Sequence, residues 1–157
     1  MTELKGIVVR LKCGSSDSAG TAQRLYLGVV SPRDGGREFP LDAPGGEEAE
    51  QLKLDVTYWI GHVWDGDVLL DAEKIVGFAG NNDTDVWPIK DLGQVNQVYL
   101  RKWGHTKKAD DDAYQLKEVE VTLYGEEPEA RTFKRRETIW LGAEYGLQVW
   151  IPEKLEK

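Results

Sequence analysis

The sequence has few of the residues that support several common kinds of protein chemistry. Among its 157 residues there is one cysteine, Cys13, and there are two histidines, His62 and His105. A single cysteine cannot form an intramolecular disulfide, and these three residues lack the spacing of a zinc site. No stretch reaches the roughly 20 apolar residues that cross a membrane as a helix. We therefore expect no disulfide, no zinc chemistry and no transmembrane segment.

Basic residues are also in the minority. The chain has 28 acidic and 20 basic residues and a formal net charge of -8, which repels nucleic-acid phosphates and favours divalent cations. Its first residues lack the basic start and apolar core of a signal peptide. We therefore expect no nucleic-acid partner, and a protein that is cytoplasmic or is exported without a cleaved signal peptide, with peripheral association at a membrane left open. The sequence does not determine the oligomeric state.

Catalytic signatures are missing as well. The chain contains neither the Gly-x-Ser-x-Gly of a nucleophile elbow nor a glycine-rich phosphate loop. We interpret His62, within Ile-Gly-His-Val-Trp, as a packed side chain rather than a general base. Pairs of carboxylates are so common on this acidic chain that they do not indicate a glycosidase. The sequence therefore predicts a binding protein and not an enzyme.

The strongest positive signal is the alternation of apolar and polar residues with a period of two. Clusters of glycine, proline and aspartate separate the alternating segments, as turns separate strands. Eight short strands with this spacing favour two packed sheets over βαβ units. We predict one all-β domain over residues 1–157, an eight-stranded antiparallel β-sandwich. The expected strands are Gly6–Lys12, Gln23–Val30, Arg37–Leu41, Thr84–Lys90, Val95–Lys102, Leu116–Tyr124, Arg131–Arg135 and Leu147–Ile151.

The segment Glu47–Gly77 does not fit this scheme, and its secondary structure is left open. Its first half alternates like a strand, whereas Asp67–Val76 is equally compatible with a short helix. Aromatic residues are concentrated in Tyr58–Trp64. One interpretation is an insertion that presents these aromatic residues to a membrane or a protein partner. The other is that the segment folds back and covers an edge or a face of a sheet.

Three motifs follow one another between Gly6 and Ile151. They are Ser18-Ala19-Gly20-Thr21 with Leu25-Tyr26-Leu27-Gly28; Phe78-Ala79-Gly80 with Asp83-Thr84, Leu92-Gly93 and Val95–Lys102; and Asp112-Ala113-Tyr114 with Leu116, Val119, Val121 and Thr138-Ile139-Trp140-Leu141. In this order they resemble the PLAT domain (LH2, the lipoxygenase-homology domain), and most closely the C-terminal domain of clostridial phospholipase C toxins. The resemblance implies a PLAT/C2-like sandwich that serves as an accessory to a separate catalytic domain, with an insertion at about residues 47–77.

The same resemblance implies calcium as a cofactor. In the toxin-type relatives the ions lie at one end of the sandwich, between the first and the third motif. By position, Asp112 would supply a carboxylate, and Ala113 and Gly20 would supply backbone carbonyls. A further carboxylate is expected just before the Gly-Thr pair, where this chain has Ser18, with Asp17 one residue earlier as its substitute.

A second calcium site of the relatives is not expected in this chain. It would need an acid where Ala22 stands, and the number of charged ligands sets much of the affinity for calcium. The alternative for the first site is that Asp110, Asp111 and Asp112 form a solvated acidic loop and that Asp17 is a turn former. The sequence leaves both interpretations open.

Aromatic and basic residues in or beside the expected loops are the candidates for contact with a membrane or a partner. Trp and Tyr favour the membrane–water interface, and a basic residue near an anionic surface adds about 1 kcal/mol. The candidate contact residues are Tyr58, Trp59, Trp64, Trp103, Arg101 and Lys102. By contrast, Trp87, Trp140 and Trp150 lie on strand-like patterns and are expected to be packed in the core or partly buried. The basic residues of Arg131–Arg136 are expected to be strand ends paired loosely with nearby acids.

The leading expectation is a non-catalytic module that binds a membrane or lipid interface with the help of calcium. The competing expectation is a protein–protein interaction module that docks through Glu47–Gly77 without lipid or calcium. The loop aromatics and basic residues favour the first. The strong acidity and the lack of a signal peptide favour the second.

Overall fold

The computed structural model describes residues 2–13, 25–41, 56–61, 75–78, 89–102, 114–142 and 146–154. These residues form strands, turns and one short 3₁₀ helix, η4 (Leu92–Gln94). The strands are β1 (Gly6–Cys13), β2 (Leu25–Ser31), β3 (Gly35–Leu41), β4 (Val56–Gly61), β5 (Ile75–Phe78), β6 (Gln97–Lys102), β7 (Tyr114–Tyr124), β8 (Ala130–Arg135), β9 (Ile139–Leu141) and β10 (Gln148–Trp150).

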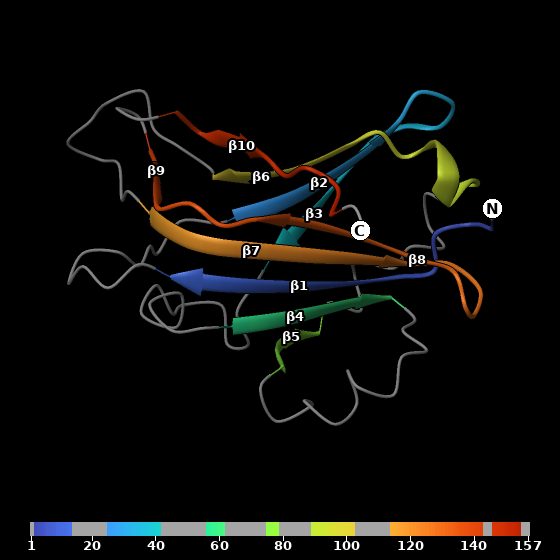
Figure 1. Cartoon of the computed structure of the whole chain (residues 1–157), viewed down its shortest axis with the longest axis horizontal. Coiled ribbons are helices and arrows are strands. Elements are labelled where there is room, and N and C mark those ends of the chain that lie inside the picture. Colours follow the sequence, from blue (N-terminus) through green and yellow to red (C-terminus); the bar gives the residue numbers. More distant parts are fainter. Residues whose placement is uncertain are drawn as a thin grey trace.

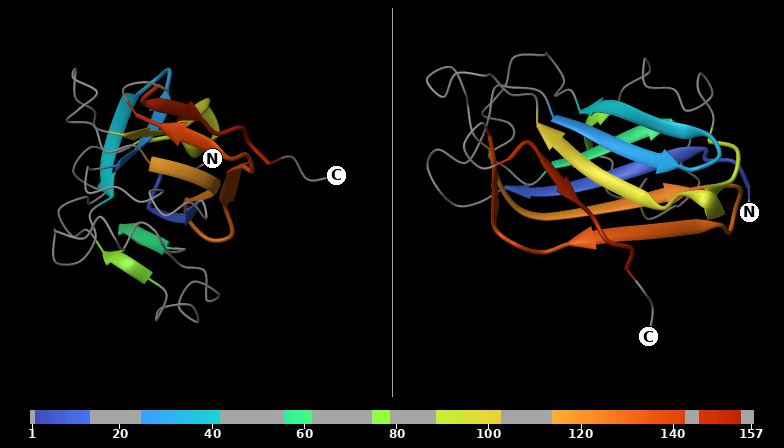
Figure 2. Two further views of the ribbon diagram at one scale, coloured as in Figure 1. Left: turned by 90° about the vertical axis from the view of Figure 1, so that its left-hand side faces the viewer. Right: turned by 90° about the horizontal axis from the view of Figure 1, so that it is seen from above.

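The strands form two open sheets that pack face to face as a β-sandwich (Figures 1 and 2). The larger sheet has the order β5-β4-β1-β7-β8, and β9 pairs with the first residues of β7. The smaller sheet has the order β10-β6-β2-β3. Neighbouring strands are antiparallel except β4 and β5, which are parallel. The expected fold class, a nearly all-β sandwich, is confirmed.

Alternation along the strands places the core between the sheets. Ile7, Val9 and Leu11 of β1 are at most 1% exposed, and Leu25 and Leu27 face them from β2. Each fully buried aliphatic side chain of this kind stabilises the fold by about 1.5–3 kcal/mol. The expected inward face of β1 is therefore confirmed for these three residues, while the side chain of Cys13 lies outside the described part.

A β-bulge adjusts the pairing of β1 with β7. The register shifts between Lys12 and Cys13, so Lys12 pairs with Glu118 and Cys13 pairs with Leu116. Leu116 and Val119 are an odd number of residues apart, yet both are fully buried in the core. The extra residue at the bulge reverses the alternation and turns both side chains inward.

Seven of the eight expected strands are present, with ends that differ by at most two residues. The eighth expected strand is Thr84–Lys90. Its residues 84–88 lie outside the described part, and its last two residues, Ile89 and Lys90, belong to no strand. The described chain has three strands beyond those expected, namely β4, β5 and β9, so the expected number of eight is too low.

The segment Glu47–Gly77 contributes β4 and most of β5 to the larger sheet. Because β4 hydrogen-bonds to β1 along Gly6–Leu11, it covers an edge that β1 would otherwise present. Ile75 and Val76 belong to β5, so the alternative of a helix is wrong for these two residues. The described residues of the segment thus fold back onto a sheet edge, while the contact surface expected around Trp59 and Trp64 stays a prediction.

The C-terminal segment 151–154 links the two sheets (Figure 2). The backbone N–H of Ile151 donates to the carbonyl of Val98 in the smaller sheet at 2.8 Å. One residue later the chain reaches the larger sheet, where the N–H of Lys134 donates to the carbonyl of Pro152 at 2.9 Å. The segment therefore occupies part of the outer edge of β8.

Candidate functional site

The first and the third sequence motif, which carry the expected calcium ligands, adjoin strand ends at the same end of the sandwich. Cys13, the last residue of β1, pairs with Leu116 near the start of β7. Leu25, the first residue of β2, pairs with Leu41 and with Lys102, the last residues of β3 and β6. We refer to this end, on the left in Figure 1, as the Cys13 end.

The expected calcium ligands belong to segments that begin or finish at the Cys13 end but lie outside the described residues. Asp17, Ser18 and Gly20 stand between β1 and β2, and Asp112 and Ala113 directly precede β7. Among the described residues, no group of three His, Cys, Asp or Glu side chains is placed to hold a metal ion. The calcium ligand set therefore stays a prediction.

Two of the six expected contact residues are corrected by the structure. Tyr58 is 2% exposed and lies in the core, where it pairs with Val9 across the sheet. Lys102 is fully buried, because it continues the inward face that Val98 and Leu100 form on β6. Buried side chains cannot meet a lipid or a partner surface, so neither residue is part of such a surface.

Three other contact candidates lie outside the part of the structure whose side chains are described: Trp59, Trp64 and Trp103. The strands that precede Trp103 and Trp64 finish at different ends of the sandwich. Trp103 follows Lys102 at the Cys13 end, whereas β4 runs away from that end and finishes at Gly61, which pairs with Gly6. The strand ends therefore place the chain before Trp103 and the chain before Trp64 at opposite ends of the sandwich.

Arg101 lies on the outer face of the smaller sheet and is held there by a carboxylate. Its Nε and Nη2 donate to the two oxygens of Glu38 at 2.7 and 2.9 Å, and its guanidinium lies 4.3 Å from the centre of the Tyr26 ring. The hydroxyl of Tyr99 donates to the same carboxylate at 3.0 Å. Charge-assisted bonds of this geometry fix all three side chains in place.

These contacts shift the protonation equilibria in the directions expected for a stable ion pair. The hydrogen bonds from Arg101 are the main reason why the pKa of Glu38 lies below its usual value. The same bonds raise the pKa of Arg101. Desolvation, followed by the bond to Glu38, raises the pKa of Tyr99. Arg101 is therefore committed to an internal partner and is a weaker lipid contact than its position in the sequence predicts.

The basic residues of Arg131–Arg136 are also paired where the structure describes a partner. Arg131 makes a bidentate ion pair with Glu153, Lys134 contacts Glu118 at 2.9 Å, and Arg135 contacts Glu137 at 2.9 Å. The expected pairing with acids is present, but Arg131 differs from the expected loose pairing at a strand end, because it lies within β8 and its side chain is only 15% exposed.

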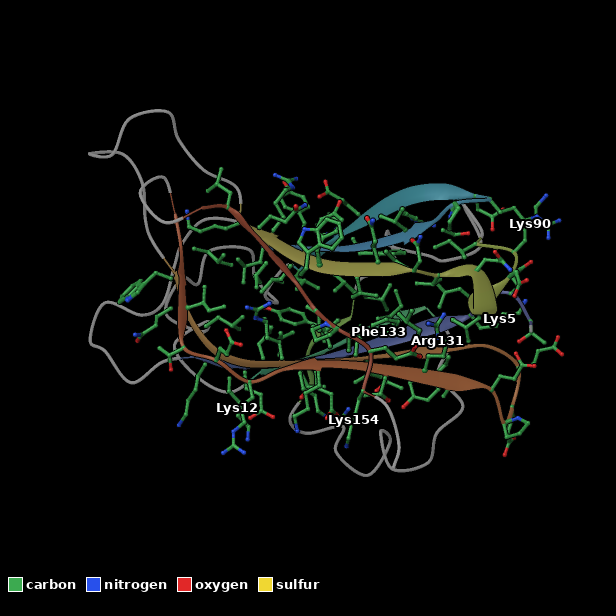
Figure 3. All side chains as sticks on the ribbon, turned by 45° about the horizontal axis from the view of Figure 1, so that its top comes forward. Lys5, Lys12, Lys90, Arg131, Phe133 and Lys154 are labelled. Atoms are coloured by element: carbon green, nitrogen blue, oxygen red, sulfur yellow. The ribbon has the colours of Figure 1, made fainter. Side chains whose placement is uncertain are left out.

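A groove of about 320 Å³ opens on the flank of the sandwich. One wall is formed by Asn96–Val98, which includes the start of β6, and the other by Trp150–Glu153. Side chains of β8, among them Arg131 and Phe133, complete the lining (Figure 3). We refer to it as the flank groove.

Trp150 was expected in the core or partly buried, and the structure excludes the core: the side chain is 51% exposed at the flank groove. The sequence did contain the signal that places it outside. Val149 is buried and its two neighbours in β10 are exposed, so a strict period of two turns Trp150 outward once Val149 faces inward.

No family model and no curated protein sequence matches this chain. Among solved structures, the alpha toxin of Clostridium absonum matches with a TM-score of 0.59 and 17% identity over 95% of this chain. An alpha-toxin of an avian strain of Clostridium perfringens matches with a TM-score of 0.57 and 15% identity, also over 95%. A lipoxygenase variant matches with a TM-score of 0.53 and 12% identity over 98%. The fold is PLAT-like.

The PLAT-like sandwich corresponds to only part of each of these neighbours. It spans 31% of each toxin chain, the PLAT-like C-terminal domain, and 17% of the lipoxygenase chain, its PLAT domain. At these identities the likeness establishes the fold, and the resemblance read from the three sequence motifs is confirmed at that level. No helix in the described part of the PLAT-like chain is long and apolar enough to cross a membrane.

Proposed function

We propose that this PLAT-like domain is a non-catalytic module that binds a membrane or lipid interface through its Cys13 end, assisted by calcium. The observation that carries the proposal is the meeting of strand ends. The segment with Asp17, Ser18 and Gly20 leaves β1 and the segment with Asp112 and Ala113 enters β7 at paired positions of one sheet end. The toxin neighbours, whose C-terminal domains share this fold, support the assignment.

In this proposal, calcium offsets the negative charge of the chain at the membrane surface. A chain with a net charge of -8 is repelled by an anionic bilayer, and the basic side chains with described partners, such as Arg101, are already paired with carboxylates. A bound cation would reverse the local sign of charge between Asp17 and Asp112 and accept lipid phosphate oxygens. Trp103, directly after β6, would add an interfacial side chain. Binding should therefore depend on calcium.

The decisive experiment is co-sedimentation with neutral and with anionic phosphatidylserine-containing liposomes at matched ionic strength, in calcium and in chelator. We expect sedimentation with anionic liposomes in calcium and its loss in chelator. Sedimentation that chelator leaves unchanged would remove calcium from the proposal. Absence of binding to every liposome would overturn the membrane function and favour the protein-docking alternative, which variants of Trp59 and Trp64 in Glu47–Gly77 would then test.

Two variants connect the binding to named residues. Asp112→Asn should weaken calcium binding in titration calorimetry by at least tenfold, because one charged ligand is lost. Glu126→Gln, on the exposed turn after β7 at the opposite end, should leave it unchanged. Trp103→Ala should reduce co-sedimentation in calcium, whereas Trp150→Ala, an equally drastic change at the flank groove, should not. Equal effects of the two members of either pair would contradict the assignment to the Cys13 end.

A further inference from the structure

The flank groove exists because the C-terminal segment leaves one sheet for the other. β10 runs beside β6, and the N–H of Ile151 makes the last bond to β6 at the carbonyl of Val98. From Pro152 onward the chain pairs with β8 instead. The space between the diverging chains is open to solvent and lies on the side of the sandwich, apart from the Cys13 end.

Trp150 is the most exposed large apolar side chain among the described residues. Its Nε1 donates to the side-chain oxygen of Gln148 at 3.1 Å, which orients the indole while half of its surface stays in solvent. An oriented aromatic ring loses little conformational entropy when a ligand packs on its face. The groove therefore has one pre-oriented aromatic platform at its rim.

Both cations that line the groove are already paired with carboxylates. Arg131 donates to both oxygens of Glu153 at 2.7 and 2.9 Å, and its Nη1 donates to the carbonyls of Leu92 and Val95 at 2.8 and 2.7 Å. Nη1 and Nη2 of Arg135 donate to the carbonyl of Trp150 and to the carboxylate of Glu137, while its buried Nε has no hydrogen-bond partner in the described part. A phosphate or sulfate would have to compete with the carboxylate that each guanidinium already binds, so an anionic ligand is disfavoured.

Neutral polar groups complete the groove. Asn96 and Gln97, at the start of β6 beside β10, also line the groove, and each side-chain amide offers two donors and an acceptor. Neither side-chain amide makes a hydrogen bond to another residue of the described part of the chain. The site thus combines a flat apolar surface with groups that both donate and accept, and it has no uncompensated charge.

We propose that the flank groove binds a neutral sugar ring of a glycan, with Trp150 as the stacking surface. The C–H bonds on one face of a pyranose carry partial positive charge and pack on the negative face of an indole. Its hydroxyls donate and accept hydrogen bonds and match the amides of Asn96 and Gln97. The volume of about 320 Å³ is at the lower end of the range for ligand sites, which suits one ring, with the rest of the glycan in solvent.

A proline-rich peptide is the nearest alternative, because such peptides also dock on aromatic side chains. They need an aromatic-lined groove that grips successive residues. The flank groove has one exposed aromatic ring, since Phe133, the other aromatic residue of its lining, is only 3% exposed. A single aromatic platform beside two amides fits a sugar ring better than an extended peptide.

The test uses the full chain on an array of neutral and sulfated glycans, followed by saturation-transfer NMR with the neutral oligosaccharides that bind. We expect neutral glycans to bind with an affinity that a tenfold increase in salt leaves unchanged. Trp150→Ala should weaken binding at least tenfold, Trp150→Tyr less than threefold, and Gln97→Ala about three- to tenfold. Leu147→Ala, which removes another exposed apolar side chain just before β10, should have no effect.

Several results would overturn the proposal. They are the absence of any neutral glycan among those bound, binding confined to sulfated glycans and lost in salt, unchanged binding by Trp150→Ala, and Trp150-dependent binding of a proline-rich peptide with none of a glycan. Circular dichroism and thermal melting show whether each variant is folded, and Trp150→Tyr keeps the test valid if Trp150→Ala does not fold. Calcium-dependent liposome binding that survives in Trp150→Ala separates this site from the membrane function.

Discussion

Gly28 is required at its position because the ring of Tyr99 lies across it. A Cβ atom at residue 28 would be 2.0 Å from Cζ of Tyr99, so any larger residue must displace the ring and its bond to Glu38. We expect Gly28→Ala to destabilise the fold by about 1–2 kcal/mol, the usual cost of overpacking. The midpoint of urea unfolding at constant slope measures this change.

Making the same substitution in a Tyr99→Ala variant distinguishes overpacking against the ring from an effect on the backbone. In Tyr99→Ala the space above residue 28 is free, and alanine is favoured over glycine in a strand by about 0.5–1 kcal/mol. The same Gly28→Ala change should therefore become neutral or stabilising. An equal loss of stability in both backgrounds would show that the ring is not the cause.

The Glu38–Arg101 pair makes stability depend on pH in a defined window. Hydrogen bonds from Arg101 lower the pKa of Glu38 below its usual 4.5, so folding favours the carboxylate. Its contribution is complete above about pH 4.5 and is lost as the pH falls through the lowered pKa of the folded protein. The wild type should exceed Glu38→Gln in stability by about 1 kcal/mol at pH 7, a value that allows for solvent screening.

Urea unfolding of both proteins between pH 7 and pH 3 measures this difference. The gap between wild type and Glu38→Gln should close below pH 4.5. Glu126→Gln, on an exposed turn, should show no such gap at pH 7. A gap that does not narrow at all between pH 7 and pH 3 would mean that the side chain stabilises the fold by packing rather than by charge.

At the scale of elements, Arg131 adds side-chain bonds to the backbone pairing between the C-terminal segment and β8. This guanidinium joins three pieces of chain, because it bonds to Glu153 and to the carbonyls of Leu92 and Val95 around η4. Lysine cannot reproduce the planar bidentate fork. We expect Arg131→Lys to destabilise the fold by about 2 kcal/mol in urea unfolding, since several charge-assisted bonds are lost at a mostly buried position.

Arg10→Lys is the matched control for this change. Arg10 lies on β1 and is paired with Glu120 at 3.6 Å in a partly exposed position, so its replacement should cost less than about 0.5 kcal/mol. Similar losses for Arg10→Lys and Arg131→Lys would mean that the link between η4, β8 and the C-terminal segment contributes little to stability.

At the scale of the whole molecule, both sheets share one core, and β4 is part of it. Ile60 is 1% exposed and belongs to the same buried cluster as Leu27 of the smaller sheet. We therefore expect a single cooperative unfolding transition. Ile60→Ala and Leu27→Ala should each cost about 2–5 kcal/mol, and each should shift far-UV dichroism and tryptophan fluorescence to the same new midpoint.

The opposite result would be informative about Glu47–Gly77. If this segment were a peripheral insertion, Ile60→Ala would leave the main transition in place and add a separate early one. Non-coincident transitions in Ile60→Ala, with coincident ones in Leu27→Ala, would therefore contradict the placement of β4 within the shared core.

The sequence by itself determined the fold class and most of the strands, because a period of two is a local property. The inward face of β1 at Ile7, Val9 and Leu11 follows from alternation alone. Alternation also predicts that Trp150 points outward and that Lys102 points inward. The type of each residue suggested the opposite side, but the structure follows the alternation.

Only the tertiary structure decided which strands are neighbours and which charges are paired. Glu38 and Arg101 are 63 residues apart, and nothing in either local pattern identifies the other. β4 lies beside β1 because an apolar strand there extends the buried face and covers an open edge. Periodicity gives a strand its two faces, but its register and its neighbours are set by the joint burial of both sheets. The flank groove, formed where one strand leaves a sheet for the other, is a product of that arrangement.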